Sequence, residues 1–234
     1  MRTLSQADFL ELWEAGRSLH PLDKGVLAVQ AAFPEFEESV ADWPLGRRNR
    51  ALAQLRCAAF GSQLRGWTAC QQCSEQLEFE MDGNALAEGT LLAGEANIVV
   101  GELSYRLPTS RDLATIVAEQ DATAAVRGLL QQCCLENNPF VHEWSDEEMD
   151  AVGECMTTAD PLAEILLRLD CPSCGASYNE SLDLPTFLWA EMEGRARRML
   201  LDIHTLASAY GWSEAEILSL RPARREVYLD MVRA

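Results

Sequence analysis

The sequence predicts an α+β fold that is predominantly helical. Two observations predict it. Helix-boundary signals recur at both ends of the chain, whereas alternating apolar and polar residues are confined to short stretches near cysteine pairs. The 234 residues can bury a substantial core, and a composition of 48% hydrophobic and 24% charged residues is ordinary for a folded domain. No apolar run reaches the ~20 residues of a membrane-spanning helix, so no membrane association is expected.

Three helices are expected in an N-terminal helical region, residues 1–64. Ser5 is placed to cap the first helix, and Pro21 suits the first turn of the second. The third is expected over Leu45 to Phe60, with Gly61 as its stop signal.

The C-terminal region, residues 186–234, is also expected to be helical. A long helix is predicted from Phe187 to Ala209. Ser213 and Glu216 form a capping box for a short helix, and Pro222 begins the last one.

Residues 84–167 are expected to contain short strands and then helices. A strand pair is predicted within residues 96–107, with a break at Gly101. The helices predicted after it are Leu113 to Glu119, Ala122 to Leu135, a short acidic helix opened by Ser145, and one opened by Asp160 that runs through Leu166 to Leu169.

Two Cys-x-x-Cys units carry the clearest chemical signal. The two-residue spacing lets a tight turn direct both thiolates of a unit at one ion, and each unit is followed by residues able to form a strand. A small residue after each unit, Ser74 or Gly175, suits such a turn. The four cysteines are Cys70, Cys73, Cys171 and Cys174.

These features predict a zinc ribbon that is split between residues 65–83 and 168–185. The cysteine pairs are separated by 97 residues, whereas ribbons usually use roughly 15–20. We interpret the intervening residues as an insertion projecting from the tip of the first hairpin, because loop-closure entropy grows only logarithmically with length. Four thiolates fill a tetrahedron, so the expected cofactor is one structural Zn²⁺ per chain.

Thiol–disulfide exchange is an alternative use of Cys-x-x-Cys, but it needs a helix after the first cysteine, and here strand-forming residues follow both pairs. The other cysteines, Cys57, Cys133, Cys134 and Cys155, have no recognisable nucleophile setting. His20, His142 and His204 form no metal-ligand pair, and phosphate-binding, dinucleotide-binding and nucleophile-elbow motifs are lacking. The sequence therefore predicts a protein that is not an enzyme.

The charge balance argues against nucleic acid as a partner. The formal net charge is −18, and phosphate backbones repel such a surface. Arginines cluster around Arg47 and Arg48, either as a solvated helix face or as a docking patch for an acidic protein. The N-terminus has no apolar signal-peptide centre, which favours a cytoplasmic location.

The segment 202–229, Asp-Ile-His-Thr-Leu-Ala-Ser-Ala-Tyr-Gly-Trp through Arg-Arg-Glu-Val-Tyr-Leu, resembles the C-terminal region of baseplate hub and hub-assembly proteins. Those proteins belong to contractile phage tails of the T4 type and to contractile injection system gene clusters. Leu107 to Leu113 also looks like a segment of zinc-knuckle members of those clusters. The phage relatives are shorter and lack the cysteine pairs.

The resemblance implies a non-enzymatic role in the baseplate hub, with hub or other tail-particle proteins as partners. Aromatic and arginine side chains dominate many protein contacts, so candidate partner-binding residues are Arg47, Arg48, Trp212, Arg224, Arg225 and Tyr228. The expected function is a cytoplasmic assembly factor, or a minor structural component incorporated into the particle. The alternatives are a zinc-ribbon module associated with nucleic acid or transcription, and a thiol oxidoreductase.

Overall fold

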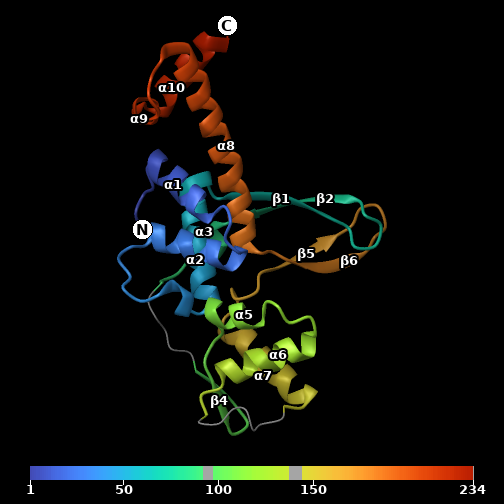
Figure 1. Cartoon of the computed structure of the whole chain (residues 1–234). Coiled ribbons are helices and arrows are strands. Elements are labelled where there is room, and N and C mark those ends of the chain that lie inside the picture. The colour runs from blue at the N-terminus through green and yellow to red at the C-terminus, as the bar shows by residue number, and fades with distance from the viewer. Residues whose placement is uncertain (92–96, 137–143, 234) are drawn as a thin grey trace.

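The computed structural model describes residues 1–91, 97–136 and 144–233. Its main body is a cluster of helices around one hydrophobic core, as Figure 1 shows. The core helices are α1 (Gln6–Gly16), α2 (Pro21–Ala32), α3 (Leu45–Phe60) and the N-terminal half of α8 (Leu184–Tyr210), with a short 3-10 helix, η1 (Val40–Asp42), before α3.

The expected start signals of the first two helices and the expected bounds of the third are confirmed. Ser5 accepts a hydrogen bond from the backbone of Asp8 at the start of α1, and α2 begins at Pro21. Gly61 caps α3 with a φ of 91°, a value that glycine adopts without strain. These local interactions fix where the body helices begin and end.

Four strands form an arm that projects from the body, and we call it the hairpin arm (Figure 1). Strand β1 (Gln63–Ala69) pairs antiparallel with β2 (Gln76–Asp82), and β5 (Leu166–Asp170) pairs antiparallel with β6 (Ser177–Ser181). Each hairpin turns at a Cys-x-x-Cys unit, so both cysteine pairs lie at the end of the arm far from the body.

Two expectations about the arm were wrong. Leu166 to Leu169 is part of strand β5 and not of a helix, because it pairs with β6 along its length and Leu182 donates a backbone hydrogen bond to Ile165. The inserted segment leaves the base of the first hairpin and not its tip. The tip is the cysteine turn itself, and Gly83, which follows β2, donates a backbone hydrogen bond to Ser62, which directly precedes β1.

The inserted segment has a hydrophobic cluster of its own, which includes Tyr105, Leu130, Trp144 and Val152. It contains the expected strand pair and three of the four expected helices, those near Leu113, Ala122 and Ser145, whereas no helix begins at Asp160 and α4 (Asn84–Ala87) was not expected. The elements are α4, β3 (Ile98–Val100), β4 (Leu103–Tyr105), α5 (Ser110–Ile116), α6 (Ala122–Cys133) and α7 (Asp146–Ala159), of which β3 and β4 pair antiparallel.

The inserted segment is fixed to the first turns of α3 at two places. Within the segment, Pro108 accepts a backbone hydrogen bond from Leu45. Near its end, the Asn49 carboxamide donates to the Leu162 carbonyl at 2.7 Å, and the Gly46 N–H donates to Asp160. The start of α3 therefore contacts residues that lie between 63 and 114 positions further along the chain.

The C-terminal helices lie at the distal end of α8, beyond the main body (Figure 1). Helix α8 ends at Gly211, which adopts the left-handed conformation with a φ of 69°. Helix α9 (Glu214–Ser219) has the expected capping box at Ser213, and α10 (Pro222–Arg233) folds back along α8. Among the described residues, no helix combines the length and the apolar character that crossing a bilayer requires.

Candidate metal centre

The two cysteine pairs converge at the end of the hairpin arm. The Sγ atoms of Cys70 and Cys174 lie 3.7 Å apart, those of Cys73 and Cys171 lie 3.6 Å apart, and all four lie within 4.8 Å of one another. A tetrahedral ion with metal–sulfur bonds of about 2.3 Å needs sulfur–sulfur separations of about 3.8 Å. The four thiols therefore lie close enough together to be ligands of one metal ion.

The two turns repeat the same backbone hydrogen bonds 101 positions apart. Cys70 N–H donates to Glu75 and Cys171 N–H donates to Ala176, both at 2.8 Å. The residue after each unit donates to the carbonyl of the first cysteine, from Ser74 at 2.8 Å and from Gly175 at 2.9 Å. Equivalent turns place equivalent sulfurs, which explains why two distant segments present a symmetric set of ligands.

The site is half enclosed. Cys70 and Cys171 are buried against Leu77, Leu169 and Tyr178, whereas Cys73 and Cys174 are exposed. Across the two hairpins, the Gln71 carboxamide donates to Glu180 at 3.2 Å. The apolar side chains around the four cysteines are few, so packing by itself gives the end of the arm little stabilisation.

The two thiols of the first turn differ in acidity. Backbone N–H groups of Cys73 and Gln72 lower the pKa of the Cys70 thiol to about 7. A backbone hydrogen bond at Glu75 lowers the pKa of the Cys73 thiol, but burial and hydrogen bonds with the neighbouring thiols outweigh it and raise that pKa to about 12. Cys70 is therefore the more readily ionised thiol of this turn.

A metal ion held by four thiolates has no free coordination position, because its ligands complete a tetrahedron and leave no place for a water or a substrate. Such an ion contributes to folding by joining segments and does not activate a reactant. Four cysteines that lie together and fit a metal ion support this role.

The remaining cysteines lie apart from the metal centre. Cys133 is buried in the hydrophobic cluster of the inserted segment, and burial raises the pKa of its thiol to about 12. Cys57 and Cys134 are half-buried, and Cys155 is exposed on α7. His20 serves as a helix cap, because its Nδ1 accepts from the Leu22 N–H at 3.3 Å, and His142 lies outside the described residues.

The expectation that Arg47 and Arg48 form a docking patch was wrong. Their side chains are only 8% and 4% exposed. The guanidinium of Arg47 lies 3.7 Å from the ring centroid of Trp43 and pairs with Glu38, while Arg48 donates to Ser110 at 2.8 Å. These arginines join α3 to its neighbours and are not available to another protein.

The C-terminal candidates divide into two kinds. Trp212 stacks on Tyr210 with ring centroids 4.7 Å apart, and Tyr228 meets Trp212 edge-on at 4.9 Å, so the three rings form one half-exposed cluster. Arg224 is exposed. Arg225 is directed inward instead, where it donates to the Gln6 side chain and lies 3.8 Å from Asp202.

Comparisons with protein-family models, with curated proteins and with solved structures found no match to this chain. The assignment of the metal centre therefore rests on the positions of the four sulfur atoms.

Proposed function

We propose that the protein is a non-enzymatic scaffold, braced by a structural zinc ion, that acts in the assembly or structure of the baseplate hub of a contractile tail-like particle. The observation that carries the scaffold role is the closed set of four thiols at the end of the hairpin arm. A site without an open ligand position supports a bracing role over catalysis.

Zinc is the metal that this ligand set favours. Soft thiolates in a tetrahedral arrangement select zinc or an iron–sulfur centre. Zinc suits a site with two exposed ligands because Zn²⁺ does not change its oxidation state. Purified protein should contain one zinc per chain by elemental analysis. Cys70→Ser should lose it, and Cys155→Ser, which changes an exposed cysteine outside the cluster, should retain it. Iron in place of zinc, or protein that folds with no metal, would contradict this assignment.

The contact surface that we assign to partners lies on the outer face of α10. Arg224, Val227, Tyr228 and Met231 are three or four positions apart, so they share one side of the helix. Val227 and Met231 are 52% and 62% exposed, next to the aromatic cluster of Trp212 and Tyr228. Exposed apolar side chains beside aromatic and arginine residues are typical of protein contact surfaces.

The identity of the partner rests on the resemblance of residues 202–229 to hub proteins. The test is co-purification from the native cells, with mass spectrometry of assembled particles and of the soluble fraction. The variant Val227→Ser/Met231→Ser should lose hub subunits while keeping its metal and its helical circular dichroism. Val99→Ser/Val126→Ser, at exposed positions of the inserted segment, is the matched control. Retention of hub subunits by both variants would refute this surface.

Two other functions predict different behaviour in the same preparation. A nucleic-acid module should bind heparin with an affinity that falls steeply as salt rises. A thiol oxidoreductase should reduce insulin as the metal-free protein, and Cys70→Ser should abolish that activity. The scaffold should show neither.

A further inference from the structure

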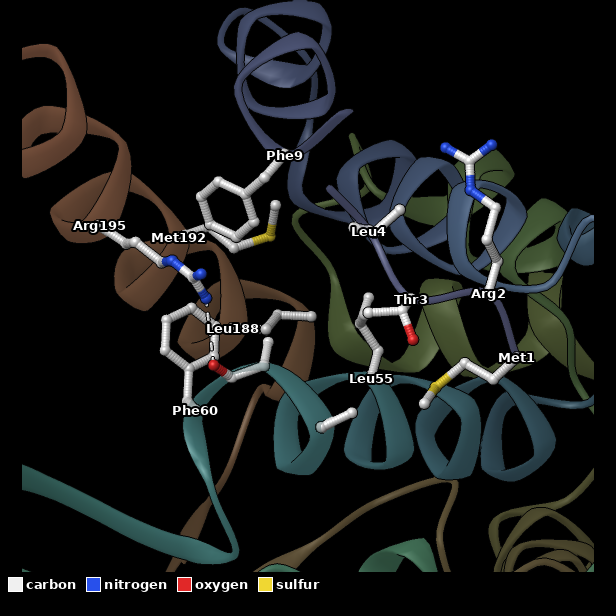
Figure 2. Close-up of a pocket in the computed structure, with 12 residues that line it drawn as sticks. Met1, Arg2, Thr3, Leu4, Phe9, Leu55, Phe60, Leu188, Met192 and Arg195 are labelled. Carbon is white, nitrogen blue, oxygen red and sulfur yellow. Dashed lines mark hydrogen bonds between the residues drawn. The ribbon is translucent and has the colours of Figure 1, made fainter. Parts of the chain in front are cut away.

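A cavity of about 210 Å³ lies in the main body, far from the metal centre. Figure 2 shows its walls, which come from the N-terminal segment, from α1, from the C-terminal half of α3 and from α8. Leu55, Leu188 and Met192 give it an apolar interior, and none of the described residues that line it is an aspartate or a glutamate.

The Arg195 side chain faces this apolar space, whereas the Arg2 side chain and the Met1 amino group, which also belong to lining residues, are paired with Asp8 and Glu35. The guanidinium of Arg195 lies 4.7 Å from the ring centroid of Phe9 and 5.8 Å from that of Phe60. Among the described residues it donates one hydrogen bond, to the Ala59 carbonyl at 3.1 Å (Figure 2). Two aromatic rings and a carbonyl therefore hold the group in place, and most of its five N–H donors are left for another acceptor.

The electrostatic surroundings of Arg195 favour an anion. No carboxylate of the described residues forms an ion pair with it, although the chain carries a net charge of −18. Burial, together with the charges of Arg225 and Arg198, lowers its pKa. A partly desolvated cation with cationic neighbours gains free energy when a carboxylate binds it through two parallel hydrogen bonds.

We propose that this cavity binds a small molecule with an unbranched apolar chain that ends in a carboxylate. The carboxylate lies on the Arg195 guanidinium, and the chain lies among Leu55, Leu188 and Met192. An apolar cavity of ~150 Å³ holds benzene, so about 210 Å³ accommodates a chain of roughly six to eight carbons. This inference is independent of the proposed role in particle assembly.

Sodium octanoate, used below its micellar concentration, is the probe for titration calorimetry on the full-length protein. Wild-type protein should bind one octanoate saturably. Arg195→Met, which keeps the length of the side chain and removes its charge, should weaken octanoate at least tenfold. The same variant should bind the uncharged chain of 1-octanol as the wild type does, because the apolar interior is unchanged.

Two further variants locate the site. Arg198→Met removes an exposed arginine of the same helix that does not line the cavity, and octanoate affinity should stay within about threefold. Ala58→Phe places a ring at an exposed position on the cavity rim and should block both ligands. Unchanged octanoate affinity in Arg195→Met, or in Ala58→Phe, would overturn the proposal. Tighter binding of octyl phosphate than of octanoate would overturn the assignment of a carboxylate.

Discussion

Asp160 caps helix α3 from a position 114 residues further along the chain. Its Oδ2 atom accepts the Gly46 N–H at 2.8 Å, at the first turn of α3, where backbone N–H groups have no partner within the helix. The Pro44 side chain, which precedes α3, cannot supply this bond. The cap therefore comes from the end of the inserted segment and ties that segment to the body.

Gly46→Ala is expected to destabilise the protein by about 2–3 kcal/mol. A Cβ at position 46 would overlap Asp160 Oδ1, so the carboxylate must move away, which removes the cap and leaves a half-buried acid without its partner. The change would otherwise raise helix propensity. The measurement is the free energy of unfolding from urea denaturation.

Gly153→Ala is the matched control for that substitution. Gly153 lies within α7, and a Cβ there meets no atom within 4 Å. Helix propensity alone then operates, and a gain of about 0.5–1 kcal/mol is expected. If both alanine variants gave the same change in stability, the long-range cap would contribute nothing.

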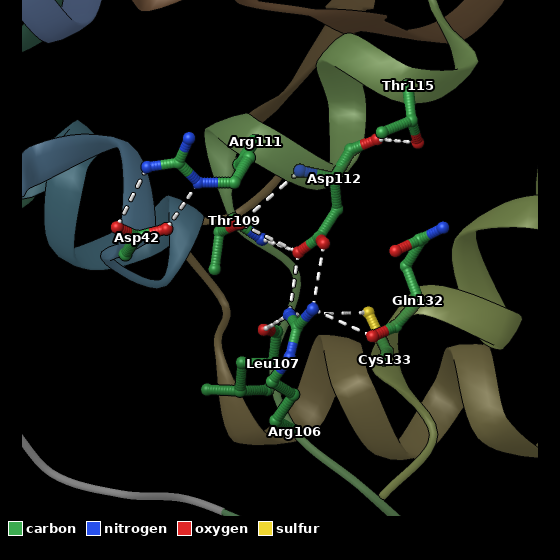
Figure 3. A network of polar contacts seen from close by, with 9 residues as sticks. All are labelled: Asp42, Arg106, Leu107, Thr109, Arg111, Asp112, Thr115, Gln132 and Cys133. Atoms are coloured by element: carbon green, nitrogen blue, oxygen red, sulfur yellow. Dashed lines mark hydrogen bonds and ion pairs between the residues drawn. The ribbon is translucent and has the colours of Figure 1, made fainter.

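Asp112→Asn is expected to cost about 2–3 kcal/mol at neutral pH. Figure 3 shows Asp112 accepting two hydrogen bonds from Arg106, at 2.6 and 2.8 Å, and one from the Thr109 backbone at 2.8 Å. Losing charge-assisted bonds at a buried carboxylate accounts for this magnitude. Asp42→Asn breaks the neighbouring pair with Arg111, which is exposed, and should cost less than about 1 kcal/mol.

The contribution of the ionised Asp112 carboxylate to the free energy of unfolding should disappear in acid. Burial raises its pKa, but the hydrogen bonds from Arg106 and Thr109 outweigh that effect, and the net pKa lies below 3.8. The stabilisation is therefore complete above pH 3.8 and is lost as the pH falls through the lowered pKa of the folded state. Urea denaturation at several pH values should show the difference between wild type and Asp112→Asn shrinking over that acidic range.

Ser74→Gly is expected to stabilise the hairpin arm by about 1 kcal/mol. Ser74 has a φ of 62°, and among the described residues it is the one non-glycine residue with positive φ. At the equivalent position of the second turn, Gly175 has a φ of 72°. Glycine adopts this conformation without the steric cost that a Cβ brings. Gly175→Ala should have the opposite sign, and thermal unfolding of the metal-loaded protein measures both variants.

Chelation of the metal should unfold the hairpin arm and leave the helical body intact. Few apolar residues support the end of the arm, whereas the body has an extensive core of its own. Hydrogen exchange should show loss of amide protection in β1, β2, β5 and β6, with α2, α3 and α8 still protected. Loss of protection throughout the chain would mean that the body depends on the metal too.

Local signals predicted many of the helix boundaries and the ligand set. Caps such as Ser5 and Ser213, and the stop at Gly61, act over a few residues, so they can be recognised without knowing the fold. The convergence of Cys70 and Cys73 with Cys171 and Cys174 was also predictable, because each turn carries its own pattern.

Features that depend on distant partners could not be predicted. Leu166 to Leu169 is an apolar run whose periodicity does not distinguish helix from strand, and pairing with β6 decides its conformation. The burial of Arg48 depends on Ser110, and no pattern around residue 48 indicates that contact. The half-buried cavity cation, Arg195, was missed because its aromatic neighbours come from α1 and α3.

The wide separation of the two cysteine turns imposes an order on synthesis. Ribosomes add roughly 5–20 residues per second, so the 101 positions between Cys70 and Cys171 represent about 5–20 s of elongation. During that interval the nascent chain holds only two of the four sulfurs. Full coordination therefore begins only after Cys174 has emerged, and until then the first turn presents bare thiols to the oxidants and competing cations of its compartment.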